Sequence, residues 1–207
     1  MKHAAGRIIS MKNPGRRMKM SQADNAKKEV RKQVKEINMQ MTPEYKKAAS
    51  DIIAEKCIKH PAFIGADSIF IFVSMPTEPD TAKIIDKAFE LGKKVYVPRC
   101  LGGGIMEAIR LTSMDDLVPG YYDILEPKAE IGPTAVSEFD SESAVAFVPC
   151  VAAARDGQRL GHGAGYYDRF LEGRKMKKLM LVYGRQLLDD VPCDEHDIVM
   201  DEVVFEG

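Results

Sequence analysis

The sequence contains few cysteines, and Cys57, Cys100, Cys150 and Cys193 stand far apart in a chain of 207 residues. A chain of this length can fold without a disulfide scaffold, and four scattered cysteines do not indicate one. We therefore expect the protein in a reducing compartment. There is no C-x-x-C pair, and Cys193 with His196 supplies only two of the four ligands of a structural zinc site. Neither a disulfide framework nor a zinc centre is therefore a leading interpretation.

Long hydrophobic runs and an excess of either charge are also missing. No stretch approaches the ~20 consecutive apolar residues of a membrane-spanning helix, so we expect no membrane partner. Thirty Lys and Arg nearly cancel 31 Asp and Glu, which leaves a formal net charge of −1. Proteins that bind bulk nucleic acid are usually far more basic, so we expect no nucleic-acid partner either.

The balance of charge hides an asymmetry along the chain. Residues 1–20 carry six basic residues and no acidic one, so the remainder has 24 basic against 31 acidic residues. We predict a disordered basic N-terminal extension over residues 1–23 and one folded domain over residues 24–207. We expect a cytoplasmic protein, with a mitochondrial location as the alternative if the extension is a transit peptide.

The folded part alternates between helix and strand patterns. Apolar residues at helical spacing predict a first helix that begins near Asp24, and Thr42-Pro43 predicts the start of a second helix that ends before Pro61. Short apolar runs predict strands over residues 68–74, 94–98, 105–111, 144–149 and 179–184. The alternation predicts an α/β fold: a single domain of three layers, α/β/α, with a mostly parallel central sheet and Rossmann-like topology.

Ligands of such sheets bind at the carboxyl ends of the strands. Met75 and Glu78 follow the first predicted strand, Arg99 follows the second, and a glycine-rich loop follows the strand over residues 144–149. Acidic, basic and glycine-rich segments therefore converge on one edge, as in a site for an anionic substrate.

The glycine-rich segment over residues 159–171 reads RLGHGAGYYDRFL. Alternating glycines let backbone N–H groups turn toward one point, Arg159 adds a forked cation, and Asp168 is placed to hold Mg²⁺ against phosphates. The segment matches neither the G-x-x-x-x-G-K-[ST] nor the dinucleotide fingerprint, and a plain surface turn is the alternative. Cys150 and His162 are considered as a nucleophile and base, but no third group orients them.

This segment, preceded by VPCVAAARDGQ, resembles the signature loop of the 5-formyltetrahydrofolate cyclo-ligase (5,10-methenyltetrahydrofolate synthetase) family. Further matches occur in order: KKEVR over residues 27–31, MPTEPDT over residues 75–81, GKKVYVPR over residues 92–99, and a tail over residues 191–201. The resemblance implies conversion of 5-formyltetrahydrofolate and ATP to 5,10-methenyltetrahydrofolate, ADP and phosphate, with Mg²⁺ as cofactor. It also implies an enzyme that acts on these small molecules, and we expect it to be a monomer.

The resemblance assigns roles residue by residue. It implies Arg159 and Tyr166 as catalytic residues, Asp168 and Asp197 as metal ligands, and Val73, Met75, Glu78, Tyr122 and Tyr166 as folate contacts. The nucleotide contacts that it implies are Lys27, Arg31, Arg159, Leu160, Gly161, His162, Gly163, Ala164, Gly165, Tyr166 and Tyr167. Each role has a structural competitor: Lys27 and Arg31 as a solvated helix face, Tyr122 as core packing, and Asp197 as a structural acid.

Three positions depart from the family pattern. Cys150 stands where a glycine is common, Ala153 stands near the usual aromatic, and Phe205 stands where many bacterial members have threonine. The departures at Cys150 and Phe205 leave open a homologue that binds folate and nucleotide without turnover. A sugar-phosphate isomerase-like enzyme on a similar scaffold is a third hypothesis, based on fold analogy alone.

Overall fold

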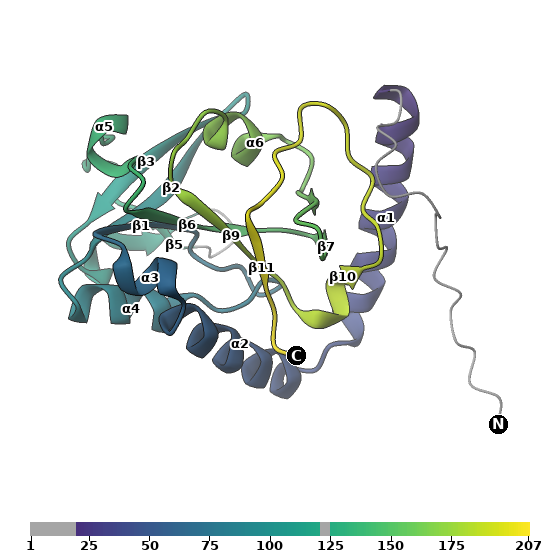
Figure 1. The fold of residues 1–207 in the computed structure, drawn as a ribbon, viewed down its shortest axis with the longest axis horizontal. Helices are drawn as coiled ribbons and strands as arrows, with labels where there is room; N and C mark the ends of the chain where they lie inside the picture. The colour runs from purple at the N-terminus through teal and green to yellow at the C-terminus, as the bar shows by residue number, and fades with distance from the viewer. Residues whose placement is uncertain (1–19, 121–124) are drawn as a thin grey trace.

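The structure is a computed structural model that describes residues 20–120 and 125–207 (Figure 1). Most of the predicted N-terminal extension and Tyr122 lie outside these residues. The helices are α1 (Met20–Gln40), α2 (Pro43–Ile58), α3 (Pro61–Gly65), α4 (Ala82–Glu90), α5 (Val136–Phe139) and α6 (Tyr166–Leu171). The strands of the central sheet are β1 (Ser68–Ile71), β2 (Lys94–Gly102), β3 (Ile105–Leu111), β6 (Ala144–Pro149), β9 (Lys177–Leu181) and β11 (Glu202–Val204).

The central sheet confirms the predicted fold class. Its strand order is β11-β9-β6-β1-β2-β3, and every neighbouring pair is parallel except β2 and β3, which form an antiparallel hairpin. In Figure 1, α2, α3 and α4 lie on one side of this sheet, while α5 and α6 lie on the other. The α/β/α layering follows from strands that are apolar on both faces.

β1 shows how the continuous apolar run serves both layers. Ile69 and Ile71 pack with residues of α2, α3 and α4, whereas Phe70 points to the opposite face. There, Phe70 stacks on Phe170 of α6, with ring centroids 4.6 Å apart, and lies 6.3 Å from Phe139 of α5. A strand that faced water on one side would alternate with polar residues instead.

α1 lies beside the layers rather than within them (Figure 1). Its buried Val34 packs in a separate small core with Ala152, Ala154, Leu160 and Val191. These partners belong mainly to a second sheet of three strands, β7 (Ala152–Ala154), β8 (Arg159–Leu160) and β10 (Leu187–Leu188). Sequence patterns did not predict this sheet, because each of its strands has only two or three residues. A further pair, β4 (Leu117–Pro119) with β5 (Leu125–Pro127), lies in the irregular region after β3.

Several element boundaries differ from the expected ones. α1 begins at Met20, upstream of the expected start near Asp24, and Ala23 is fully buried. The predicted helix start at Thr42-Pro43 is correct: the Thr42 side chain accepts a hydrogen bond from the Tyr45 amide. β1 ends three residues before the predicted strand end, and a turn follows in which the Glu78 amide donates a hydrogen bond to the Met75 carbonyl.

None of the helices within residues 20–120 and 125–207 is both long enough and apolar enough to span a bilayer.

The stacked ring of Phe70 carries a large share of the packing between the sheet and α6. We expect Phe70→Ala to lower the free energy of unfolding by about 3–5 kcal/mol, because it leaves a cavity between two other aromatic rings. Urea unfolding of this variant and of Ile64→Ala, whose side chain is 64% exposed, checks this. A Phe70→Ala loss no larger than that of Ile64→Ala would contradict the assigned packing.

Candidate active site

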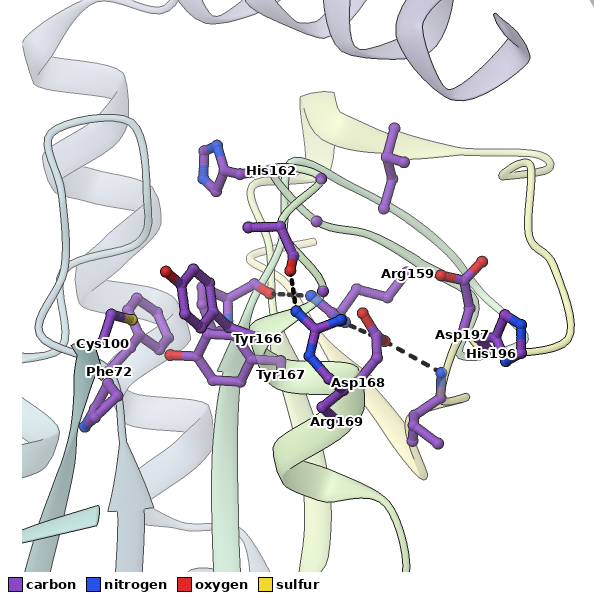
Figure 2. Close-up of a pocket in the computed structure, with 18 of the residues that line it drawn as sticks. Phe72, Cys100, Arg159, His162, Tyr166, Tyr167, Asp168, Arg169, His196 and Asp197 are labelled. Atoms are coloured by element: carbon purple, nitrogen blue, oxygen red, sulfur yellow. Dashed lines mark hydrogen bonds and ion pairs between the residues drawn. The ribbon is translucent and has the colours of Figure 1, made fainter. Parts of the chain in front are cut away.

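A cavity of about 830 Å³ opens at the carboxyl ends of β1, β2 and β6. α1, the glycine-rich loop and the segment over residues 194–198 complete its walls (Figure 2). Every predicted site residue within the described part of the chain lines it: Lys27, Arg31, Val73, Met75, Glu78, the whole of residues 159–168, and Asp197. Tyr122 lies outside the described residues, so its predicted role stays a prediction.

The topology explains the place of the cavity. From β1 the chain crosses to β2 on one side, and later returns to β6 and then β9 on the other side. Between β1 and β6 the connections therefore lead away in opposite directions, which leaves a crevice beyond the strand ends where ligands of α/β sheets bind. Val73 follows β1 and Pro149 ends β6, so both border this crevice.

The glycine-rich loop follows the short strand β8 directly and leads into α6. Gly163 and Gly165 have φ angles of +105° and +65°, which side chains with a Cβ rarely adopt. The Nε of Arg31 on α1 donates a hydrogen bond to the Gly161 carbonyl at 2.8 Å. A Cβ on Gly163 would lie 3.3 Å from the Arg31 guanidinium carbon, so the glycines let this cation approach the loop closely.

Arg159 is the cation at the base of the loop, and its side chain is 4% exposed. Its Nη2 donates to Asp168 Oδ1 at 2.7 Å, and Nη1 donates to the Pro149 carbonyl at 3.4 Å. Its Nε is buried and has no hydrogen-bond partner among the described residues. Since an unsatisfied buried donor is costly, a ligand oxygen at this position would be favoured.

Lys27 occupies the other end of the cavity, between two carboxylates. Its Nζ lies 2.8 Å from Asp194 Oδ2 and 2.5 Å from Asp197 Oδ2. Burial lowers the pKa of Lys27, but the hydrogen bonds and charges of Asp194 and Asp197 offset it, so the net pKa is raised. Burial raises the pKa of Asp194, but the hydrogen bonds from Lys27 and from the His196 amide, with the charges of Lys27 and His196, more than offset it, so the net pKa is lowered. Lys27 is therefore charged and compensated, rather than a solvated residue of an exposed helix face.

Asp168 and Asp197 fit the predicted role in holding Mg²⁺. One oxygen of each is occupied: Asp168 Oδ1 accepts from Arg159 and from the Ile198 amide, and Asp197 Oδ2 accepts from Lys27 and the Asp194 amide. The second oxygen of each carboxylate has no hydrogen bond to the described residues. Those residues contain no group of three metal-ligating side chains, so a Mg²⁺ ion here would take most of its ligands from phosphate and water.

Glu78 is a buried carboxylate in the same cavity, 6% exposed. Its Oε2 accepts a hydrogen bond from the Met75 amide at 2.9 Å, and Oε1 lies 3.8 Å from His162 Nε2. Tyr183 Oη donates to the Glu78 carbonyl at 2.8 Å and fixes the turn that presents this side chain. Glu78 is thus positioned to accept hydrogen bonds from a ligand with two adjacent N–H donors.

Sequence patterns missed Arg169, which joins two segments far apart in the chain. Its Nε donates to the Gly104 carbonyl at 3.0 Å, and its Nη2 donates to the Ala164 carbonyl. A Cβ on Gly104, whose φ is +80°, would lie 1.5 Å from Nη2. The three consecutive glycines over residues 102–104 were visible in the sequence, but nothing there indicated which side chain they accommodate.

None of the three departures from the family pattern, at Cys150, Ala153 and Phe205, lines this cavity. Cys150 is buried, and burial raises the pKa of its thiol to about 12, which disfavours the thiolate that a nucleophile would need. Phe205 packs between Lys56 and Arg155. Cys193 and His196 likewise belong to no metal-ligating group in residues 20–120 and 125–207.

Comparison with known proteins agrees with this geometry. The model of the 5-formyltetrahydrofolate cyclo-ligase family matches residues 23–206, almost the whole chain. The chain belongs to the 5-formyltetrahydrofolate cyclo-ligase family.

Two relatives and one solved structure illustrate the relationship to other cyclo-ligases. The chain is 30% identical over 170 residues to 5-formyltetrahydrofolate cyclo-ligase of Escherichia coli K12, covering 79% of this chain and 91% of that protein. It is 29% identical over 201 residues to the Mus musculus cyclo-ligase, covering 88% and 95%. The NMR structure of Aquifex aeolicus 5,10-methenyltetrahydrofolate synthetase superposes with a TM-score of 0.72 at 27% identity, covering 86% of this chain and 88% of that chain.

Within this cyclo-ligase fold, the cavity has two chemically different ends. In Figure 2, Asp197 and His196 lie at one end, while Phe72 and Cys100 lie at the other, with the loop residues between them. The first end is charged, and the second is partly apolar.

The cluster of Lys27, Asp194 and Asp197 gives a pH-dependent prediction for this cyclo-ligase. The ordinary pKa values are 10.5 for Lys27 and 3.8 for Asp194. Because the pKa of Lys27 is raised, its ion pairs stabilise the fold fully below pH 10.5. Because the pKa of Asp194 is lowered, its ion pair stabilises the fold fully above pH 3.8. We expect Lys27→Met to reduce the free energy of unfolding by about 1–3 kcal/mol within that window, since two half-buried carboxylates lose their partner. The difference from wild type shrinks as the pH falls through the lowered pKa of Asp194 or rises through the raised pKa of Lys27.

Urea unfolding from pH 3 to 11 measures this difference, with Lys28→Met, an exposed neighbour on α1, as the control. A deficit of Lys27→Met that stays constant over the whole range would contradict the assigned ion pairs.

Proposed function

We propose that the protein catalyses the ATP- and Mg²⁺-dependent conversion of 5-formyltetrahydrofolate to 5,10-methenyltetrahydrofolate, with release of ADP and phosphate. The observation that carries this proposal is a single cavity with two different ends. One end holds cations paired with protein groups and two carboxylates that each have one oxygen without a hydrogen bond to the described residues. The other end holds the buried carboxylate of Glu78. Membership of the cyclo-ligase family supports the same activity.

The charged end suits the triphosphate of ATP. Arg31 reaches the loop from α1, Arg159 reaches it from β8, and the backbone N–H groups of residues 161–165 lie between them. α6 has only six residues, so the cations supply more of the attraction for phosphate than the helix terminus does. Lys27 adds a third charge when phosphate oxygens replace its present carboxylate partners.

Asp168 and Asp197 would hold Mg²⁺ through their unoccupied oxygens. The ion, when bound, neutralises charge on the phosphates as the phosphoryl group transfers. The hydrogen bonds from Arg159 and from the Ile198 amide fix the orientation of the Asp168 carboxylate, and with it the direction in which Oδ2 points.

The other end suits the folate. Glu78 would accept two hydrogen bonds from the aminopyrimidine edge of the pterin, while Val73 and Met75 flank the ring. Tyr166 lines the cavity at the start of α6, between the two ends, and is our candidate for contact with the reacting groups.

The reaction divides into two steps. The formyl oxygen attacks the γ-phosphorus of ATP, ADP leaves, and the product is an iminium phosphate at N5. N10 then attacks the formyl carbon, which closes the ring. N10 loses its proton to solvent or to the departing phosphate, and phosphate leaves with the former formyl oxygen, so that the methenyl cation remains. The protein aligns the formyl oxygen with the γ-phosphate, and the buried Nε–H of Arg159 is a donor for the charge that develops on the transferred group.

The four cysteines support placing this enzyme in a reducing compartment, and we propose the cytoplasm. All four are free, and none is needed as a crosslink to hold the described fold.

A direct assay tests the proposal. Purified protein mixed with 5-formyltetrahydrofolate and MgATP should form the methenyl chromophore, which absorbs in the near ultraviolet, with one ADP released per product. Saturable folate binding without ADP release would instead indicate a homologue without turnover. ATP-independent turnover of a sugar phosphate would indicate the isomerase-like alternative.

Asp168→Asn tests the metal assignment. We expect it to lower the Mg²⁺-dependent kcat by about 100-fold and to shift half-saturation to higher Mg²⁺, because a neutral amide is a poor ligand for a hard cation. It should also cost about 1–3 kcal/mol of stability, since Arg159 loses its charged partner. Asp189→Asn, at an exposed site outside the cavity, is the control, and normal turnover by Asp168→Asn would overturn the assignment.

Glu78→Gln tests the pterin assignment. The amide can still accept from the Met75 N–H, but it presents a donor where the pterin needs an acceptor. We expect the KM for 5-formyltetrahydrofolate to rise about 10- to 100-fold with the KM for ATP unchanged. Steady-state kinetics of this variant is compared with that of Glu90→Gln, which changes an exposed side chain of α4 outside the cavity. An unaltered folate KM would refute the role of Glu78.

A further inference from the structure

Two hydroxyl groups are buried beneath the loop that carries Glu78. Ser50 on α2 is 5% exposed, and Tyr183, which follows the end of β9, is 2% exposed. Neither side chain lines the cavity of the candidate active site. Burying a hydroxyl is costly unless it forms hydrogen bonds, so the partners of these two groups indicate what they do.

The two hydroxyls bind each other and the backbone on both sides of Pro79. Ser50 Oγ accepts a hydrogen bond from the Asp80 amide at 3.0 Å, and Tyr183 Oη donates to the Glu78 carbonyl at 2.8 Å. Ser50 Oγ and Tyr183 Oη lie 3.1 Å apart. Neither backbone group belongs to a helix or a strand, so side chains supply the partners that these groups need.

The chemistry of the groups fixes the direction of each hydrogen bond. A carbonyl oxygen only accepts, so the single phenol proton of Tyr183 is committed to Glu78. Tyr183 Oη is then left to accept, and the hydroxyl proton of Ser50 is directed to it. The three bonds form one continuous chain that starts at the Asp80 amide and ends at the Glu78 carbonyl. In such a chain each bond strengthens the next.

The contacts within the tip of the loop hold its shape rather than its place relative to the sheet. The Glu78 amide donates to the Met75 carbonyl at 2.9 Å, and Glu78 Oε2 accepts from the Met75 amide at 2.9 Å. This turn and its carboxylate therefore form one unit, which contacts from other segments must position.

Within residues 20–120 and 125–207, the hydrogen bonds that reach residues 75–80 from other segments come from Ser50, Tyr183 and Lys46. The bond from Lys46 to the Pro76 carbonyl is exposed to solvent, whereas the hydroxyls of Ser50 and Tyr183 are buried. Exposed hydrogen bonds exchange readily with water, so the buried pair contributes most to the place of the turn.

We propose that Ser50 and Tyr183 are positioning residues for Glu78, and that their chain of hydrogen bonds places its carboxylate and thereby sets the affinity for the folate. This inference rests on the proposed function, in which Glu78 accepts two hydrogen bonds from the pterin. Two parallel hydrogen bonds require both carboxylate oxygens to be in place within about 0.5 Å. Both hydroxyls lie outside the cavity, so they act through Glu78 and not by contact with the ligand.

Tyr183→Phe removes the phenol hydroxyl and keeps the ring. We expect the Kd for 5-formyltetrahydrofolate, measured by calorimetry without ATP, to rise about 5- to 10-fold, as the loss of one hydrogen bond predicts. The KM for the folate should rise by a similar factor, while kcat and the KM for ATP stay within about twofold of wild type. Ser50→Ala breaks the same chain at its other member and should weaken folate binding to a similar extent.

Tyr96→Phe is the matched control. Tyr96 is also fully buried, and its Oη donates to the Glu138 carbonyl at 3.2 Å, but it packs on the opposite face of the sheet and does not line the cavity. Both variants should lower the urea midpoint of unfolding, whereas only Tyr183→Phe should weaken folate binding. Equal losses of stability with an unchanged folate Kd in Tyr183→Phe would show a merely structural hydroxyl and overturn the proposal.

Glu78→Gln provides a second test, because a residue that acts through the Glu78 carboxylate has little to position once that carboxylate is replaced. In the Glu78→Gln background, we expect Tyr183→Phe to raise the folate Kd by less than about twofold. A further increase of about 5- to 10-fold in that background would show that Tyr183 acts independently of Glu78, and would overturn the proposal.

The chromophore assay keeps this outcome separate from the proposed function. Formation of the methenyl product, with an unchanged folate Kd in Tyr183→Phe, would refute the positioning role alone. Folate binding that is weakened in Tyr183→Phe but not in Tyr96→Phe, without turnover by the wild-type protein, would refute the catalytic proposal and leave the positioning role standing.

Discussion

One carboxylate oxygen, Oδ1 of Asp168, holds three separate parts of the chain together. It accepts hydrogen bonds from Arg159 at the base of the glycine-rich loop and from the Ile198 amide of the C-terminal segment, while Asp168 itself belongs to α6. Arg159 in turn reaches the carbonyl of Pro149 at the end of β6. A buried guanidinium requires such compensation, so the position of the loop relative to the central sheet depends on this pair.

The same principle applies to three further cations of the site, each of which has a protein partner. Lys27 is held by two carboxylates, and Arg31 and Arg169 are held by loop carbonyls. The site can therefore present several cations to a phosphate chain while the folded part of the protein carries a net negative charge.

How far the sequence predicts this structure depends on the length and regularity of each element. β6 and β3 match their predicted bounds because each is a continuous apolar or alternating run with clear ends. β7, β8 and β10 escaped prediction because two or three residues show no periodicity, and they form only through pairing with one another. The glycine-rich loop was identified by its motif, yet its attachment to β8 became visible only in the fold.

The sequence by itself determined the fold class, the family, and which residues gather at the carboxyl ends of the strands, because these follow from local periodicity and from contiguous motifs. Only the tertiary structure decided what each of those residues contacts. It paired Lys27 with Asp194 and Asp197, and Arg169 with Gly104. Such partners lie tens to more than a hundred positions apart, and the contacts form when sheet and helix packing bring them together, so no local pattern carries them.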